Sequence, residues 1–446
     1  MTATTIRLPA LERHFGDRAI LPGDARFEAA RAVWNGTVDT RPAAVLRCAD
    51  AADVALALRI ARAEGLPVAV RGGGHQIAGA AVVADGVVLD LSPMRYADIS
   101  ADGTVSVGGG ALLGDLDRAT DRVGRVVPAG TVSHTGVGGL TLGGGVGWLS
   151  PRLGLTCDSL ISVDLVTAAG ETRTVDAGTD PDLFWALRGL GANFGVATRF
   201  VFRTHPQGPV VAGRSEVPLD RTAEVLTRIG ACAAELPRAL GVLARLERPA
   251  AVPVLGVEWV WSADPADAAA AIRPLGLPAG TVRTRRFPAV QTTVDHRFPH
   301  GGRYYLKPAQ LAELGPAQAE ALVEGATRFP AGDPQLEVLR LGGAVADVPQ
   351  EATAFPGRAA AFAVNVTARA DDPALEAAQR RWARETHAVI AGLGTGGAYL
   401  NFADRELDLA TVLGAPVHDR LRRVKHRLDP DDVFRPAQHI TPRPEQ

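Results

Sequence analysis

Short apolar and β-branched runs alternate with glycine-rich connections through the first 200 residues. This alternation predicts strands at residues 44–47, 67–70, 87–91, 104–107, 161–167 and 195–204. Apolar residues at helical spacing predict helices at residues 53–64, 112–123 and 181–187. Asp180 precedes Pro181 and is the expected N-cap of the last helix. The first part of the chain is therefore expected to be rich in short strands.

The pattern changes after a proline-rich stretch at residues 205–209. Alanine-rich helical segments are expected at residues 222–234, 265–272, 316–326 and 373–390. Strands are expected between them at residues 252–259, 335–341 and 359–367, which suggests an α+β unit with a substantial sheet. The tail again carries Gly, Asn and Asp, and residues 398–402 are predicted as a strand. We predict domains at residues 1–205 and 206–395, with residues 396–446 returning to the first.

Composition narrows the classes of protein. The chain has 446 residues, of which 46% are hydrophobic and 22% charged, enough for a large core in two or more domains. A formal net charge of −2 does not favour binding to nucleic acid or to an anionic membrane surface. The apolar runs are shorter than a membrane span, and the start shows no signal peptide pattern. We therefore expect a cytoplasmic protein whose partners are small molecules, present as a monomer or homodimer.

The cysteines and histidines do not predict a metal site. Cys48, Cys157 and Cys232 are too few for a disulfide framework and lack the spacing of a zinc site. His296 and His300 form a pair without a third ligand nearby in the sequence. No metal is expected.

Glycine clusters into four runs, at residues 71–75, 108–110, 136–139 and 143–147. Such runs let backbone N–H groups approach a ligand closely, and four of them favour a large polyanionic ligand such as a dinucleotide. The one GxGxxG match, at residues 392–397, follows a predicted helix and precedes a predicted strand, which is the wrong order for a Rossmann fingerprint. Neither lysine, Lys307 or Lys425, follows a glycine-rich loop, so a Walker A motif is excluded.

Several segments resemble, in order, the motifs of one flavoprotein family. They lie at residues 68–79, 128–148, 154–170, 182–189, 193–198, 399–402 and 428–438. Together they are similar to the berberine-bridge-enzyme group of the vanillyl-alcohol-oxidase superfamily, particularly its bacterial members and flavoenzymes of antibiotic biosynthesis. The resemblance implies an α+β fold of the two-domain VAO/PCMH type, in which an antiparallel-sheet substrate domain is inserted into an FAD-binding domain.

The resemblance also implies how FAD is held. His75 follows three glycines at the point where the family forms an 8α-histidyl bond to FAD. Cys157 stands in a Gly-Leu-Thr-Cys-Asp segment, where the resemblance suggests a second, 6-S-cysteinyl bond. We therefore expect bicovalent FAD, and expect Cys48 and Cys232 to be structural.

Further FAD contacts are expected along the same motifs. The residues are Arg71, Gly72, Gly73, Gly74, Gln76, Gly79, Pro128, Gly130, Thr131, Ser133, Gly136, Gly138, Gly139, Gly143, Asp158, Gly195, Val196 and Asn401.

Three residues are candidates for catalysis. Tyr399 matches a Tyr-x-Asn pattern in which the family's Tyr can act as a base, and the predicted strand places Tyr399 and Asn401 on one face. A free tyrosine has a pKa of about 10, so this role needs a nearby positive charge or coupled proton transfer. Glu337 and Asn365 lie on predicted strands of the second domain. Glu337 is either an acid or base of the site or a solvated charge.

These residues predict an FAD-dependent oxidase. A hydride of an alcohol, amine or sugar group on a small molecule would pass to flavin N5, and dioxygen would be the final acceptor. One alternative is a dehydrogenase or oxidative cyclase with another acceptor, and a second is a carbohydrate oxidase. A third is a flavin-binding protein without catalysis.

Overall fold

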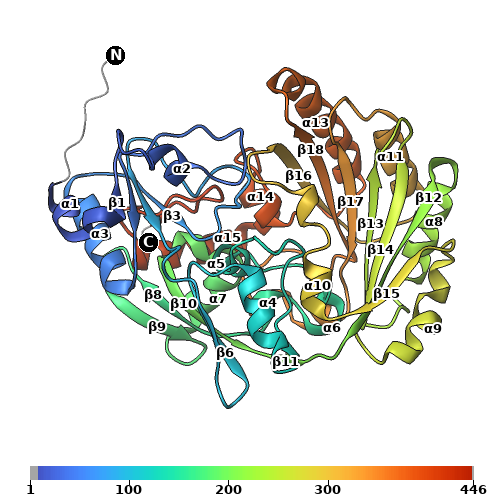
Figure 1. The fold of residues 1–446 in the computed structure, drawn as a ribbon, viewed down its shortest axis with the longest axis horizontal. Coiled ribbons are helices and arrows are strands. Elements are labelled where there is room, and N and C mark those ends of the chain that lie inside the picture. Colours follow the sequence, from blue (N-terminus) through green and yellow to red (C-terminus); the bar gives the residue numbers. More distant parts are fainter. Residues whose placement is uncertain (1–8, 444–446) are drawn as a thin grey trace.

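A computed structural model of the chain describes residues 9–443 and contains two groups of sheets (Figure 1). The first sheet has the order β1 (Ala19–Ile20), β2 (Ala44–Arg47), β4 (Val87–Asp90), β3 (Val68–Arg71). Strands β2 and β3 both pair in parallel with β4, and helix α3 (Ala51–Ala63) lies between β2 and β3 in the sequence. The Asp50 side chain caps α3 by accepting from the Asp53 N–H. Strand β3 ends at Arg71, directly before the glycines of the first run.

The second sheet of the N-terminal part is antiparallel. Its order is β5 (Ala97–Ile99), β6 (Thr104–Gly108), β10 (Val196–Arg203), β8 (Leu160–Val166), β9 (Thr172–Asp176). Around it lie α4 (Leu113–Asp121), α5 (Val137–Leu142) and α7 (Pro181–Leu190). The Asp180 carboxylate accepts from the Leu183 N–H at 3.0 Å, which confirms the predicted N-cap.

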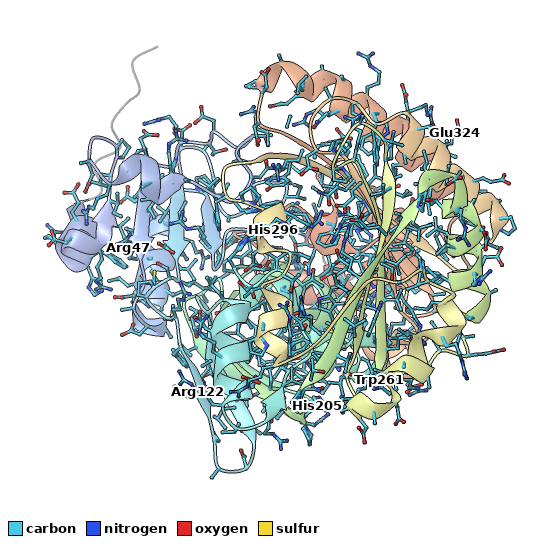
Figure 2. The ribbon with its side chains drawn as sticks, turned by 45° about the vertical axis from the view of Figure 1, so that its right-hand side comes forward. Arg47, Arg122, His205, Trp261, His296 and Glu324 are labelled. Carbon is cyan, nitrogen blue, oxygen red and sulfur yellow. The ribbon has the colours of Figure 1, made fainter. Side chains whose placement is uncertain are left out.

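The largest sheet is antiparallel and built almost entirely from residues 210–370. Its order is β15 (Thr281–Arg285), β12 (Val210–Pro218), β14 (Val254–Trp261), β13 (Leu240–Glu247), β17 (Gln335–Arg340), β18 (Phe362–Ala370), β16 (Arg303–Leu311). Helices α8 (Leu219–Cys232), α11 (Pro316–Thr327) and α13 (Glu376–Gly392) cover one face (Figure 1). Figure 2 shows Glu324 on α11, on the side away from the N-terminal sheets. The opposite face is only partly covered, by residues 148–149 and 287–290, and its uncovered part can form the wall of a site.

The tail returns to the N-terminal part. Helices α14 (Leu409–Leu413) and α15 (Ala415–Leu428) place Leu421 and Val424 in the same apolar core as Phe200 and Phe202. The buried Lys425 ammonium donates to the backbone carbonyls of Asn193 and Phe434. We propose the domain division at residues 205/206 and 395/396 on the basis of this packing.

The remaining elements are short. They are α1 (Pro9–Phe15), α2 (Phe27–Arg31), β7 (Arg125–Val126), α6 (Ser150–Leu153), β11 (His205–Pro206), α9 (Ala268–Ile272), α10 (Phe287–Gln291), α12 (Ala344–Asp347) and nine 3₁₀ turns among the described residues. Within residues 9–443, no helix is both long and apolar enough to cross a bilayer.

The α+β architecture agrees with the fold class expected from the sequence. One predicted element is wrong. Residues 398–402 form no strand: Tyr399 lies in a loop, and Leu400–Phe402 is a 3₁₀ turn. The backbone N–H groups of Phe402 and Ala403 bond within the turn instead, to the carbonyls of Tyr399 and Leu400.

Candidate active site and cofactor cavity

A cavity of about 290 Å³ lies between the N-terminal sheets and the uncovered face of the seven-stranded sheet. Its wall combines four distant stretches: the loop after β3, the segments flanking α5, the strands β17 and β18, and the tail segment around Tyr399. A cavity at such a junction, with a few polar groups in a mainly apolar wall, is the usual form of a small-molecule site.

The glycine runs let two stretches of backbone meet at the cavity wall. A Cβ placed on Gly73 would stand 2.3 Å from the Gly136 nitrogen, and one on Gly72 would stand 2.9 Å from the Gly109 carbonyl oxygen. Gly74 has a φ of +70°, which other residues rarely adopt. A side chain at Gly73 would push the loop after β3 off the start of α5, and one at Gly72 would meet the residue that follows β6. The wall is thus a backbone cradle, as the sequence analysis expected.

Many of the expected cofactor residues line this cavity. They are Gly72, Gly73, Gly74, His75, Gln76, Gly130, Thr131, Gly136, Gly139, Gly143 and Asn401. The three catalytic candidates Glu337, Asn365 and Tyr399 line it as well. Other expected residues are not part of the wall. They are Arg71, Gly79, Pro128, Ser133, Gly138, Cys157, Asp158, Gly195 and Val196.

Two of the residues outside the wall, Arg71 and Asp158, are held by other partners. The Arg71 guanidinium donates to Asp90 at 2.9 Å, and both side chains are buried beneath the β3 loop. Asp158 receives two bonds from the buried Arg358, at 2.7 and 3.1 Å. These charges support the glycine loops from behind instead of contacting a ligand.

Cys157 is also outside the wall, and its expected bond to the flavin stays a prediction. Its side chain is fully buried in an apolar cluster with Val146, Phe355 and Tyr399. Burial raises the pKa of the thiol, and the neighbouring Asp158 raises it further, so the nucleophilic thiolate is disfavoured. The structure therefore places Cys157 as a packed core residue and not at the cavity surface.

His75 lines the cavity from the loop that follows β3. The Trp34 ring stacks on its imidazole, with ring centroids 4.9 Å apart and planes 17° from parallel. Its Nε2 lies 2.8 Å from Nδ1 of His134. Burial lowers the pKa of His75 well below its usual value, with His134 and His300 as smaller causes, so the ring is neutral at pH 7.

Tyr399 and Asn401 meet in the wall of the same cavity. The Asn401 side-chain amide donates to the Tyr399 hydroxyl oxygen at 2.8 Å and to the Leu140 carbonyl at 3.0 Å. The Val146 N–H also donates to the Tyr399 hydroxyl, at 3.2 Å. The predicted shared site is therefore present, although a turn and not a strand creates it. A Cβ on Gly143 would stand 1.9 Å from the Asn401 carbonyl oxygen, so only glycine allows this approach.

Within residues 9–443, the largest influences on the pKa of Tyr399 include no positive charge of the kind that a Tyr399 base would need. Burial raises the pKa of Tyr399 to about 12, and the hydrogen bonds from Asn401 and Val146 offset only part of that effect. At neutral pH the Tyr399 hydroxyl keeps its proton.

Glu337 belongs to a buried ion-pair network and is not a solvated charge. Its Oε1 accepts from Nη2 of Arg245 at 2.9 Å, and its Oε2 accepts from the Asn365 amide at 3.2 Å. Arg245 is 1% exposed and also pairs with Glu258 at 2.8 Å. The carbonyl oxygen of Asn365 has no partner among residues 9–443. Glu337 and Asn365 therefore present acceptors to the cavity, held in place by Arg245.

A smaller chamber of about 50 Å³ adjoins the cavity beside Glu337 and Tyr399. Thr131, Glu337, Asn365, Tyr399 and Phe402 line both spaces. The chamber's further wall is apolar and comprises Leu243, Leu339, Ala363 and Val364. A substrate bound here would reach Tyr399 and Glu337 together.

Sequence reasoning missed several residues of the site. Asn193 and Gln438 line the cavity and lie in motifs that the analysis had already identified. No sequence pattern identified Trp34, Phe298 and Leu306, because only the folding of the chain brings them to the cavity wall.

Sequence spacing paired His300 with His296, but the structure groups His300 with two other histidines. His75 and His134 join His300 from the other part of the chain, and ring nitrogens of the three lie within 4.8 Å of one another.

Comparisons with known proteins agree with this geometry. A family described as "FAD binding domain" matches residues 42–176, and one described as "Berberine and berberine like" matches residues 398–441. An FAD-linked oxidoreductase of Dictyostelium discoideum is 30% identical over 419 residues, covering 92% of this chain and 91% of that protein.

Two solved structures are similar over nearly the whole chain. The structure of 6-hydroxy-D-nicotine oxidase from Arthrobacter nicotinovorans has a TM-score of 0.85 and 28% identity, covering 96% of this chain and 98% of that one. Aclacinomycin oxidoreductase has a TM-score of 0.86 and 27% identity, covering 95% and 99%.

Proposed function

Because the chain belongs to the berberine-bridge-enzyme-like family of FAD-linked oxidoreductases, we propose that it is an oxidase of an alcohol or amine group on a small molecule, with dioxygen as the final acceptor. Bound FAD would supply the hydride acceptor, its N5 atom. The observation that carries the proposal is one cavity whose wall holds His75 together with Glu337, Asn365 and Tyr399.

The residues of the cavity fit FAD. The backbone of Gly72–Gly74 meets that of Gly136 so closely that a Cβ would fill the space, and such a surface suits a pyrophosphate. Asn193 and Gln438 are joined across the wall, since the Asn193 amide donates to the Gln438 carbonyl at 3.0 Å. These groups would hold the dinucleotide, while His75 and Asn401 would flank its ring.

We place a single covalent attachment at His75. A neutral imidazole on the cavity wall is a competent nucleophile toward the 8α carbon of the flavin. The second attachment expected at Cys157 is not kept in the proposal, because the thiol is fully buried, protonated and behind the wall.

Tyr399 and Glu337 would contact the same group of the substrate, Tyr399 as a hydrogen-bond donor and Glu337 as an acceptor. Tyr399 is protonated at neutral pH and would donate a hydrogen bond to the substrate oxygen or nitrogen. The Glu337 carboxylate, held by Arg245, would accept a proton or hydrogen bond from the same group. The apolar side chains of the smaller chamber would take the rest of the substrate. The related structure of 6-hydroxy-D-nicotine oxidase supports an amine among the candidate substrates.

The attachment is tested by acid precipitation followed by mass measurement. Wild-type protein and Cys157→Ala should both retain one FAD after precipitation, whereas His75→Ala should release all of it. If His75→Ala retained FAD, the attachment would lie at another residue. If Cys157→Ala alone released FAD, Cys157 would be the point of attachment.

The acceptor is tested by stopped-flow reoxidation. Flavin reduced by a substrate should return to the oxidised spectrum in air-saturated buffer, with hydrogen peroxide formed in equal amount. Slow reoxidation in air, with fast reoxidation by a quinone or dye, would make the protein a dehydrogenase. A flavin that none of a panel of alcohols, amines and sugars reduces would indicate a binding protein.

A further inference from the structure

The wall of the smaller chamber carries two hydrogen-bond acceptors on neighbouring strands. Glu337 on β17 and Asn365 on β18 are register partners, and both line the chamber and the cavity. The Asn365 amide nitrogen donates to Glu337 Oε2 at 3.2 Å and to the Thr367 hydroxyl at 2.9 Å. Because a carboxylate can only accept, this pairing fixes which end of the Asn365 amide is the nitrogen. Its carbonyl oxygen is therefore left as an acceptor.

That oxygen of Asn365 is buried without a partner. Asn365 is 5% exposed, and no donor within residues 9–443 bonds to its carbonyl oxygen. An unpaired buried acceptor costs free energy, which a donor on a bound molecule recovers. An ammonium group has several N–H donors and can satisfy this oxygen and the Glu337 carboxylate together, whereas an alcohol has a single O–H.

Glu337 also stands at the cavity end of a chain of ion pairs that crosses strands β17, β13, β14 and β12. The chain holds four carboxylates and three guanidiniums, which belong to Glu216, Glu247, Glu258, Glu337, Arg214, Arg245 and Arg297. It therefore carries one negative charge in excess. Glu337 is the one charged side chain on the part of the smaller chamber's wall that the structure describes. A cation bound there would balance the excess at short range.

Two aromatic rings border the same space. Tyr399 and Phe402 line both the cavity and the chamber, with ring centroids 4.9 Å apart and planes at 76°. Phe402 is 39% exposed, which leaves its ring available to a ligand. Aromatic rings attract cations through their negative faces. A carboxylate, an amide oxygen and two aromatic rings together favour an ammonium ion over a neutral hydroxyl group.

The rest of the chamber's wall limits what the nitrogen can carry. It is apolar and includes Leu243, Leu339, Ala363 and Val364. The volume of about 50 Å³ has room for roughly three to five atoms of the size of a water molecule. A sugar would bury several hydroxyl groups against this wall without partners, whereas an alkyl group would gain from the same burial.

We infer that the smaller chamber binds an alkylammonium group, whose nitrogen donates to Glu337 and to the Asn365 carbonyl oxygen while a small alkyl group packs against Leu339 and Ala363. The substrate is then an amine with a small alkyl group beside its nitrogen, in preference to an alcohol or a sugar. Asn365 sets this preference, because it adds the acceptor that a single O–H leaves unpaired. The choice of substrate rests on the oxidase activity proposed above, whereas the binding preference does not.

Oxidation of such an amine balances with the groups already proposed. One N–H proton passes to the Glu337 carboxylate, and the adjoining C–H bond breaks with its electron pair, which leaves as a hydride for the bound FAD. A C=N bond forms, and water hydrolyses the resulting iminium ion. Dioxygen takes up the two electrons and two protons and leaves as hydrogen peroxide.

The binding preference is tested with two molecules of the same shape. tert-Butylammonium and tert-butanol have no hydrogen on the carbon beside the nitrogen or oxygen, so hydride transfer cannot consume them. Their binding to the oxidised holoprotein is measured at pH 7 from the change in flavin absorbance. The variants are Glu337→Gln and Asn365→Leu, each checked for retained FAD. Glu224→Gln is the matched control, because Glu224 is exposed on α8, which covers the opposite face of the sheet.

We expect wild type to bind tert-butylammonium at least about tenfold more tightly than tert-butanol, since a charged hydrogen bond is the stronger one. Affinity for tert-butylammonium should fall about 10- to 100-fold in Glu337→Gln and about three- to tenfold in Asn365→Leu. Affinity for tert-butanol should change by less than about threefold in each variant. Glu224→Gln should bind both molecules as wild type does.

The substrate class is tested by anaerobic reduction of the flavin. Isopropylamine and 2-propanol are of similar size, and both carry the hydrogen that the tert-butyl compounds lack. Isopropylamine should reduce the flavin of wild type at least about tenfold faster than 2-propanol, and Asn365→Leu should narrow this ratio.

The outcomes separate the inference from the proposed function. Equal affinity of wild type for tert-butylammonium and tert-butanol would overturn the inference, and so would a preference that Glu337→Gln and Asn365→Leu both retain. Reduction by 2-propanol or a sugar, but not by isopropylamine, would overturn the substrate class and leave the oxidase activity in place. Preferential binding of tert-butylammonium to a flavin protein that no amine, alcohol or sugar reduces would uphold the binding site and refute the proposed function.

Discussion

At the scale of single residues, Tyr399 shows how surroundings decide a role that residue type leaves open. Its hydroxyl oxygen accepts from the Val146 N–H and the Asn401 amide, and its own proton has no acceptor among residues 9–443. Burial holds the pKa at about 12. The side chain that the sequence suggested as a base is thus better suited, at neutral pH, to donate a hydrogen bond.

Replacing Tyr399 with Phe should leave FAD bound and attached but slow the reduction of the flavin by substrate about 10- to 100-fold, because one hydrogen bond to the reacting group is lost. Stopped-flow reduction under anaerobic conditions measures this rate. Val210→Ala, a core change in β12 outside the cavity, is the control for a general effect of destabilisation. An unchanged rate in Tyr399→Phe would exclude the tyrosine from the reaction.

The pH dependence distinguishes donor from base. Because burial raises the pKa of Tyr399 above its usual value of 10, the protonated form persists until the pH approaches 12. The Tyr399-dependent part of the flavin reduction rate, obtained by comparing wild type with Tyr399→Phe, should therefore stay flat from pH 7 to 9. A tenfold increase per pH unit over that range would mean that the phenolate is the reacting form.

At the scale of elements, close backbone contacts couple loops that are distant in the sequence. The glycine run after α5 approaches the tail turn so closely that Gly143 has no room for a Cβ beside Asn401. The bond from Asn401 to the Leu140 carbonyl then ties the tail to the end of α5. The site depends on how these loops fit together as much as on its polar groups.

Gly143→Ala should displace Asn401 and lower the free energy of unfolding by about 1–3 kcal/mol, the usual cost of overpacking. Flavin reduction should slow as well, since Asn401 also holds the Tyr399 hydroxyl. Gly392→Ala is the matched control, because a Cβ at Gly392 would meet nothing within 4 Å. Equal stability of the two variants, measured by urea unfolding, would contradict the close approach.

Helices α4 and α10 bury an acid between them. Asp117 on α4 is 2% exposed, and neither of its carboxylate oxygens has a hydrogen-bond partner among residues 9–443. Burial raises its pKa to about 7, while Gln291 on α10 opposes that effect. The carboxyl is therefore protonated in the folded chain below pH 7.

This raised pKa predicts a loss of stability with rising pH. The unfolded carboxyl ionises near pH 4, so the folded state is penalised progressively from about pH 4 to pH 7, by roughly 1.4 kcal/mol per pH unit. Asp117→Asn should remove this dependence. Its free energy of unfolding, compared with that of wild type, should therefore be higher at pH 8 than at pH 5. Urea unfolding of both proteins at pH 5 and pH 8 measures this effect. If the stability of wild type and of Asp117→Asn changed equally between the two pH values, the prediction would be refuted.

At the scale of the whole molecule, the tail closes the cavity and anchors it to the N-terminal core. Lys425 on α15 is fully buried and donates to the Asp429 carboxylate at 2.6 Å and to the Asn193 carbonyl at 3.0 Å. Asn193 in turn accepts from the Ile440 N–H at 2.9 Å through its side chain and lines the cavity. One buried cation thus joins the tail to the cofactor wall.

Lys425→Met should lower the free energy of unfolding by about 3–5 kcal/mol, because it leaves the buried Asp429 carboxylate without its cation. FAD affinity of the flavin-free protein should fall too, since Asn193 loses its support. Arg427→Met, on the exposed side of α15, should change stability by less than about 1 kcal/mol. Thermal unfolding and FAD titration of both variants test the contrast.

The sequence by itself determined the fold class, most helices and strands, the glycine cradle and the family. These follow from local periodicity and from ordered motifs such as Arg71–His75, which act over a few residues. It also predicted the grouping of Tyr399 with Asn401, although the strand expected there is a turn.

Only the tertiary structure decided the rest. Cys157 and His75 both carry nucleophilic atoms, yet packing buries the thiol behind Tyr399 and leaves the imidazole on the cavity wall. The ion pair that holds Glu337, between β13 and β17, and the meeting of His134 with His300 join residues far apart in the chain. No local pattern predicts such contacts, because burial, pKa and partner depend on which distant elements pack together.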